Sequence, residues 1–214
     1  MKIDTKNLVK SITDSLERLE YIKLDEIPGI DLYMDQVTTL MDKKLRSVTR
    51  YPQEDKILTK TMINNYAKND LLPPPIKKKY SKEHVLVLIF IYYFKGILSI
   101  SDIQTLLQPI TDKYFQNGKD FGIKEIYEEV FRMEPNEIEV LKQDMVKKYE
   151  MAQSSFEGVP EEETEFLRQF SFICLLSYDV YIKKLIIEKM IDDMRPKAPE
   201  KNQKPEKEKK NNKE

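Results

Sequence analysis

The stretch LTKTMINNYAKNDLLPPPIKKKYSKEHVLVLIFIYYFKGILSISDIQTLL, residues 58–107, decides the fold. It holds a short polar segment, three consecutive prolines, a lysine run and then an almost wholly apolar segment. Thr59 can cap a helix over residues 60–68, because its side-chain oxygen can accept backbone N–H bonds. Prolines cannot continue a helix, so residues 73–75 predict an extended connection. The stretch therefore predicts a small exposed helix joined by a basic loop to a buried helix.

The apolar segment from Val85 to Phe94 has almost no polar face, which predicts a buried supporting helix. Beyond it, either Ser99 with Asp102 or Ser101 with Gln104 provides a capping-box signal for a further helix. A polar helix, a basic loop and a buried third helix make up the pattern of a winged helix-turn-helix.

In that pattern the polar helix would enter the DNA major groove and the lysine loop would contact phosphates. Asn is a weak helix former, and it can read adenine through two hydrogen bonds, so paired Asn residues on a short helix favour base contacts. The alternative is an ordinary solvated polar surface. The candidate DNA-binding residues are Lys60, Thr61, Asn64, Asn65, Lys68, Lys77, Lys78 and Lys79.

The same stretch resembles the MerR-type DNA-binding head, in which a Thr-x-Ile-Arg-Tyr-Tyr helix is followed by Gly-Leu-Leu-Pro and then by a basic residue before Tyr-Ser. The sequence departs from that pattern at Asn64, Asn65 and Asp70, where the family carries Arg, Tyr and Gly. The resemblance implies a winged helix-turn-helix that binds DNA, without the phosphate contact of the missing Arg. The matching positions are Thr61, Ile63, Tyr66, Leu71, Leu72, Pro73, Lys79, Tyr80 and Ser81.

Residues 30–37, IDLYMDQV, followed by residues 59–80, resemble more closely a bacterial family called domain of unknown function 1836, which is often described as MerR-like. This resemblance covers about residues 24–125.

The composition predicts a mainly helical, all-α protein of one or two domains. The chain has 214 residues, of which 40% are hydrophobic, and only 5 are Gly. A single cysteine excludes an internal disulfide. The N-terminus lacks the apolar segment of a secretory signal, and no stretch reaches the roughly 18 apolar residues of a membrane span. We therefore expect a cytoplasmic protein without a membrane partner.

Positive charge is concentrated on the candidate DNA-binding unit. The net charge of the chain is −1. Residues 55–82, however, contain seven lysines and two aspartates, and residues 197–214 contain seven lysines and four glutamates. The rest of the chain is therefore acidic, which favours nucleic-acid binding by one surface.

Helical spacing predicts an N-terminal packing or dimer-contact helix over residues 4–21. A second helix, capped by Asp31 and running to about Ser47, would be the first helix of the helix-turn-helix, before a long connection at residues 48–56. Its inward residues would be Tyr33, Val37, Leu40, Met41 and Leu45.

The C-terminal half predicts helices over residues 123–133 and 135–153, and a long helix from Pro160 to Met194. The long helix is apolar on most sides, so neighbours or a second subunit must bury it. Cys174 is expected to be a buried small residue. A set of aromatic residues could form core or line a pocket for a small-molecule effector: Tyr127, Phe131, Tyr149, Phe166, Phe170, Tyr178 and Tyr181.

These patterns divide the chain into an N-terminal arm (1–23), a MerR-like domain (24–122), a helical region for dimerisation and a possible effector (123–195) and a disordered tail (196–214). The leading hypothesis is a homodimeric, sequence-specific transcription regulator. The alternative is a helical protein-interaction module on a winged-helix scaffold, without specific DNA binding.

An enzyme is disfavoured, because one Cys and one His cannot supply a Cys/His zinc cluster or paired Glu-x-x-His ligands, and there is no Gly-rich phosphate loop. We predict no catalytic residue, no metal site and no cofactor. His84, at the start of the buried helix, is expected to be structural.

Overall fold

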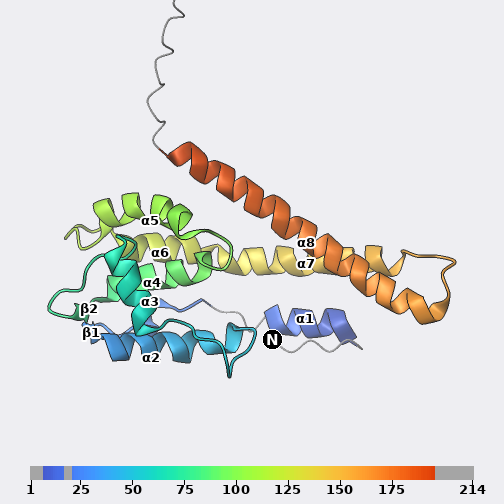
Figure 1. The fold of residues 1–214 in the computed structure, drawn as a ribbon, viewed down its shortest axis with the longest axis horizontal. Helices are drawn as coiled ribbons and strands as arrows, with labels where there is room; N and C mark the ends of the chain where they lie inside the picture. Colours follow the sequence, from blue (N-terminus) through green and yellow to red (C-terminus); the bar gives the residue numbers. More distant parts are fainter. Residues whose placement is uncertain (1–6, 17–20, 196–214) are drawn as a thin grey trace, which may run out of the picture.

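The computed structural model describes residues 7–16 and 21–195, and these form a mainly helical protein (Figure 1). The predicted all-α class is confirmed. The predicted tail and the ends of the predicted N-terminal helix lie outside the described residues. The elements are α1 (Leu8–Leu16), η2 (Leu24–Glu26), β1 (Leu32–Tyr33), α2 (Met34–Leu45), η3 (Arg46–Val48), α3 (Lys60–Lys68), β2 (Lys79–Tyr80), α4 (Lys82–Phe94), α5 (Ile100–Tyr114), α6 (Ile123–Arg132), α7 (Glu134–Gln153) and α8 (Glu161–Met194).

The main hydrophobic core is built around α4, in which every side chain from Val85 to Ile91 is buried. A continuous apolar run of this kind is stable only where other elements cover the helix on all sides. Four helices, α2, α3, α5 and α6, contribute their apolar faces to the same core. Their buried members are Val37, Met41, Leu45, Ile63, Tyr66, Ile103, Leu107, Ile123 and Tyr127.

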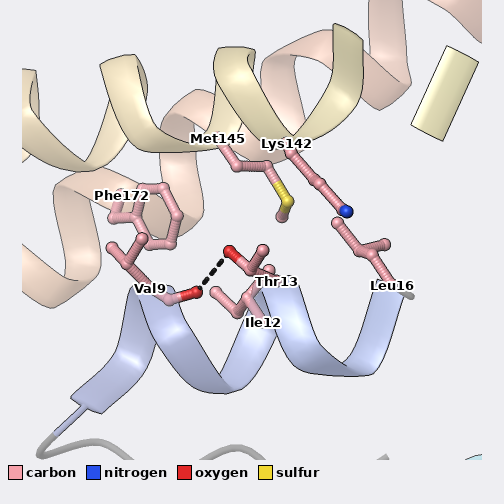
Figure 2. Close-up of a pocket in the computed structure, with 7 residues that line it drawn as sticks. All are labelled: Val9, Ile12, Thr13, Leu16, Lys142, Met145 and Phe172. Carbon is pink, nitrogen blue, oxygen red and sulfur yellow. Dashed lines mark hydrogen bonds between the residues drawn. The ribbon is translucent and has the colours of Figure 1, made fainter. Parts of the chain in front are cut away.

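A second, smaller core joins α1 to α7 and α8 (Figure 2). Ile12 and Leu16 of α1 are buried together with Ala152 and Phe172. The space left between α1 and these helices is too small to hold a water molecule. The N-terminal helix therefore packs within its own chain.

The long helix α8 crosses α7 and returns to the main core (Figure 1). Its far end is fixed to the start of α5, where Arg195 contacts the Asp102 carboxylate at 2.5 Å. Asp102 also completes the predicted capping box with Ser99, whose side chain accepts the Asp102 backbone N–H at 3.1 Å. The hydrogen bond from Ser99 and the charge of Arg195 lower the pKa of Asp102.

The start of α2 differs from the prediction. Residues 32–33 pair with residues 79–80 as antiparallel strands, so the helix begins at Met34 instead of after Asp31. Gln36 provides the cap, because its side-chain oxygen accepts the Tyr33 backbone N–H at 2.8 Å. Tyr33 was predicted to point inward, but the residue is 55% exposed.

α8 was predicted to be covered by neighbours or by a second subunit, and the neighbours within this chain leave much of it exposed. Cys174, expected in the core, is exposed. The proposed effector aromatics do not gather around one pocket: Tyr127 and Phe131 belong to the main core, Tyr149 to the smaller core, and Phe166, Phe170, Tyr178 and Tyr181 are exposed on α8. None of the described helices has the length and apolar character needed to cross a membrane.

Candidate nucleic-acid interface

The helix α3 separates its side chains cleanly into a buried and an exposed face. Thr59 caps it as predicted, since the Met62 backbone N–H donates to the Thr59 hydroxyl at 3.1 Å. Ile63 and Tyr66 enter the main core. Met62 packs partly buried against the same core, and with 3.6 residues per turn the polar positions face solvent. The exposed polar residues of α3 are Lys60, Thr61, Asn64, Asn65 and Lys68, all of them candidate DNA-binding residues.

Asp70 makes the turn that the MerR-type pattern assigns to Gly. Its φ is 55°, in the left-handed region. Just before it, the Asn69 backbone N–H donates to the Asn65 carbonyl at 3.0 Å. Just after it, the Leu71 N–H donates to the Tyr66 carbonyl at 2.9 Å, which closes the helix end as in a Schellman motif. This turn directs Leu71 and Leu72 into the core.

Replacing Asp70 by glycine is expected to raise the free energy of unfolding by about 0.5–1 kcal/mol, because glycine adopts a positive φ without steric cost. Thermal unfolding of the purified variant measures the change. Asp70→Ala is the matched control, since it removes the same charge but keeps a Cβ atom, and it should give no gain. Equal stabilisation by both variants would mean that charge, not backbone conformation, sets the cost.

A lysine hairpin, residues 76–79, follows the three prolines. Ile76 and Lys79 exchange two backbone hydrogen bonds, at 3.1 and 2.9 Å. Between them, Lys77 and Lys78 have φ values of 50° and 62°, which are typical of a type I′ turn. Asn-Gly is the preferred pair at these positions, because other side chains are strained at positive φ. The hairpin thus holds two exposed lysines at its tip at a conformational cost.

Two of the other three candidate lysines make contacts within the chain. Lys79 lies opposite Tyr33 in the β1–β2 pair, and its ammonium group is 5.4 Å from the centre of the Tyr33 ring. Lys60 forms an ion pair with Asp35 of α2. Among the described residues, no side-chain ion pair or hydrogen bond is seen at Lys68, Lys77 or Lys78. These three carry the charge that is free to meet an anionic partner.

His84 connects the two ends of the loop that carries the lysine hairpin. Its Nδ1 accepts the Ser81 backbone N–H at 2.9 Å, so in the neutral ring the proton is on Nε2, which is 3.3 Å from the Pro74 carbonyl oxygen. The ring also packs edge-on against Tyr80 and Phe115. Burial lowers the pKa of His84, which keeps the ring neutral. The sequence predicts a structural role for His84 but does not indicate these contacts.

A separate pocket of about 460 Å³ lies between the α2–α3 connection and the end of α4. Arg50, Lys56 and Lys95 line it together with Tyr92. The Lys95 ammonium group donates to the Ile57 carbonyl at 2.7 Å, and burial lowers its pKa. The predicted effector aromatics are not part of this pocket, and the effector stays a prediction.

α3 and the lysine hairpin lie at the end of the molecule away from the α7–α8 pair (Figure 1). A family model described as Domain of unknown function (DUF1836) matches residues 22–130, which run from η2 through most of α6 and make up just over half of the chain. No curated protein and no solved structure gives a significant match. The helices α7 and α8 lie beyond the matched range.

Proposed function

This chain belongs to the DUF1836 family, and we propose that α3 and the lysine hairpin form the DNA-binding surface of a MerR-like winged helix-turn-helix transcription regulator. One observation carries the proposal. The short helix α3 exposes only polar and basic residues, and the hairpin that follows it presents two lysines without side-chain partners in the described structure.

Each part of this surface has a distinct role in the proposal. Asn64 and Asn65, near the middle of α3, would read base edges in the major groove. Lys68 would contact the DNA backbone at the end of the helix, and Lys77 and Lys78 would contact it from the hairpin. Backbone contacts of this kind fix the position of the protein, whereas base contacts discriminate between sequences. Lys60 and Lys79 would contribute less, because Asp35 and Tyr33 already engage them.

A salt titration tests the lysine contribution. Alanine at Lys68, Lys77 and Lys78 together is expected to weaken binding to all DNA sequences and to flatten the slope of log K against log salt by up to about 2.7, or about 0.9 per phosphate contact. The measurement is fluorescence anisotropy with DNA from upstream of the gene and with a scrambled duplex.

The matched control removes three exposed lysines from other parts of the chain, Lys119, Lys124 and Lys147. It changes the net charge by the same amount and should leave the salt slope close to that of the parent protein. Asn64→Ala in the same titration should reduce the preference for the upstream DNA while leaving the slope unchanged. Identical slopes for the parent and for the Lys68/Lys77/Lys78 variant would refute the phosphate assignment.

The protein-interaction module remains the second candidate, and the exposed apolar face of α8 favours it. Weak binding without sequence preference, together with co-purification of a discrete partner, would support this second function.

A further inference from the structure

The exposed side of α8 carries a regular apolar stripe. We use the name α8 stripe for Phe166, Phe170, Ile173, Val180 and Tyr181, each of which is more than half exposed. Positions 166, 170, 173, 177, 180 and 184 alternate in steps of four and three, the spacing of a seam that packs against a second helix. At two of them, Ser177 and Lys184 replace apolar residues.

The opposite side of the same helix is already covered. Phe172 is buried and packs with α1 and α7, while Leu175 and Leu176 are half-buried against the same small core. Figure 2 shows the Phe172 ring directed toward α1. The contacts of α8 with α1 and α7 therefore leave the stripe uncovered.

The stripe is large enough to be an interface. Each aromatic residue has about 150–250 Å² of surface to bury. With Tyr178 beside the stripe, four aromatic rings and two aliphatic side chains therefore expose on the order of 600 Å². Monomeric proteins rarely expose a contiguous apolar patch much larger than a few hundred Å². A standard interface buries about 800 Å² on each partner, so this patch supplies most of what a stable dimer needs.

We propose that the α8 stripe pairs with the α8 stripe of a second copy of this chain, in an antiparallel arrangement with its two-fold axis near residue 175. Position 175 is midway between Phe166 and Lys184, the two ends of the seam. A two-fold interface requires a self-complementary surface, and an apolar seam of this kind meets its own copy without unpaired charges at its centre.

The charges of α8 specify the antiparallel direction. The start of the helix carries Glu161, Glu162, Glu163 and Glu165. Residues 183–189 are net positive, because they carry Lys183, Lys184 and Lys189 against a single acidic residue, Glu188, which forms an ion pair with Lys184. Antiparallel pairing places the glutamates of one copy beside the lysines of the other, and it also opposes the two helix dipoles. Parallel pairing would place like charges together, which is unfavourable.

The C-terminal end of the chain does not offer an alternative cover. Residues 197–214 contain no large apolar side chain that could bury aromatic rings. The proposal also stands apart from DNA binding, because the α8 stripe and α3 belong to different parts of the molecule (Figure 1). Its test therefore reads the oligomeric state and needs no DNA.

Sedimentation velocity of the full chain tests the interface. The parent protein is expected to be a dimer, and Phe170→Glu with Ile173→Glu should raise the dissociation constant by at least about 30-fold, since it places charge in the centre of the seam. Val130→Glu with Met190→Glu is the control, as both residues are exposed outside the stripe. A monomeric parent protein, or a stripe variant that dimerises as tightly as the parent, would overturn the proposal. Circular dichroism checks that the helices remain.

Disulfide formation tests the direction. In a Cys174→Ala background, subunits with Phe166→Cys are mixed with subunits carrying Lys184→Cys and oxidised. An antiparallel pair brings position 166 of one copy next to position 184 of the other, so crosslinks between the two kinds of subunit are expected. Crosslinks that join only two Phe166→Cys subunits or two Lys184→Cys subunits would refute the antiparallel arrangement.

Discussion

Replacing Tyr127 by alanine is expected to lower the free energy of unfolding by about 3–5 kcal/mol, the usual cost of removing a buried aromatic ring. Tyr127 is fully buried, and its ring lies 4.5 Å from Phe131 and 5.6 Å from Phe90, measured between ring centres. Its hydroxyl also donates to the Ile22 carbonyl at 2.7 Å. Tyr127 of α6 therefore contacts both Ile22, at the start of the residues that match the family, and Phe90 of α4.

Urea unfolding of two variants separates the ring from the hydroxyl. Tyr127→Phe keeps the ring packing and leaves the Ile22 carbonyl without its donor, so we expect a loss of about 1–2 kcal/mol. Phe121→Ala is a control for an aromatic residue that is mostly exposed, and its effect should stay within about 0.5 kcal/mol. If Tyr127→Ala were no more harmful than Phe121→Ala, α6 would not be part of the main core.

This result bears on the domain boundary predicted at residue 122. α6 begins at Ile123, which is fully buried in the same core as α4. The family match continues to residue 130 and includes Tyr127. The sequence has little pattern between residues 109 and 122, although α5 continues through this range to Tyr114, and weak periodicity does not show whether the next helix packs on the preceding core. We expect a chain cut after residue 122 to be unstable.

Local signals predicted several elements correctly. The Thr59 cap, the burial of Ile63 and Tyr66 and the exposure of Asn64 and Asn65 all follow from helical spacing near one capping residue. The run from Val85 to Ile91 is buried as its composition indicates. These features depend on contacts close in sequence or on apolar content alone, and such properties can be read from one sequence.

Features that depend on distant contacts could not be predicted in this way. The β1–β2 pair contains two residues on each side, too few to show an alternating pattern, yet it moves Tyr33 to the surface. The left-handed conformations of Lys77 and Lys78 are unusual for lysine, so residue preferences alone would not suggest a type I′ turn. An apolar helix such as α8 indicates that something covers it, but not whether that partner is in the same chain.

Replacing His84 by alanine is expected to lower the free energy of unfolding by about 2–4 kcal/mol and to weaken DNA binding in the proposed function. The imidazole joins Pro74, before the lysine hairpin, to Ser81, after it. Without the ring, the two ends of this loop lose their direct connection, so the hairpin should hold its lysines less firmly. Thermal unfolding and hydrogen exchange at residues 76–81 measure the two effects.

The protonation of His84 should make the stability of the protein depend on pH. Burial lowers the pKa of His84 in the fold, against the weaker opposing effects of the Pro74 carbonyl and the Asp31 charge. In the unfolded chain the pKa is about 6.5, so the unfolded state binds the proton more readily. The stabilisation is therefore complete above about pH 6.5 and is lost as the pH falls below that value toward the folded pKa.

His84→Asn separates this titration from other groups, because its side-chain oxygen can still accept a hydrogen bond but does not titrate. Between about pH 5 and pH 8, the melting temperature of the parent protein should fall on acidification more steeply than that of His84→Asn. Parallel curves would show that His84 is not the group responsible. A steeper parent curve would identify His84 as the group responsible. We expect its protonation to break the bond that anchors the lysine hairpin, since a protonated Nδ1 cannot accept the Ser81 backbone N–H.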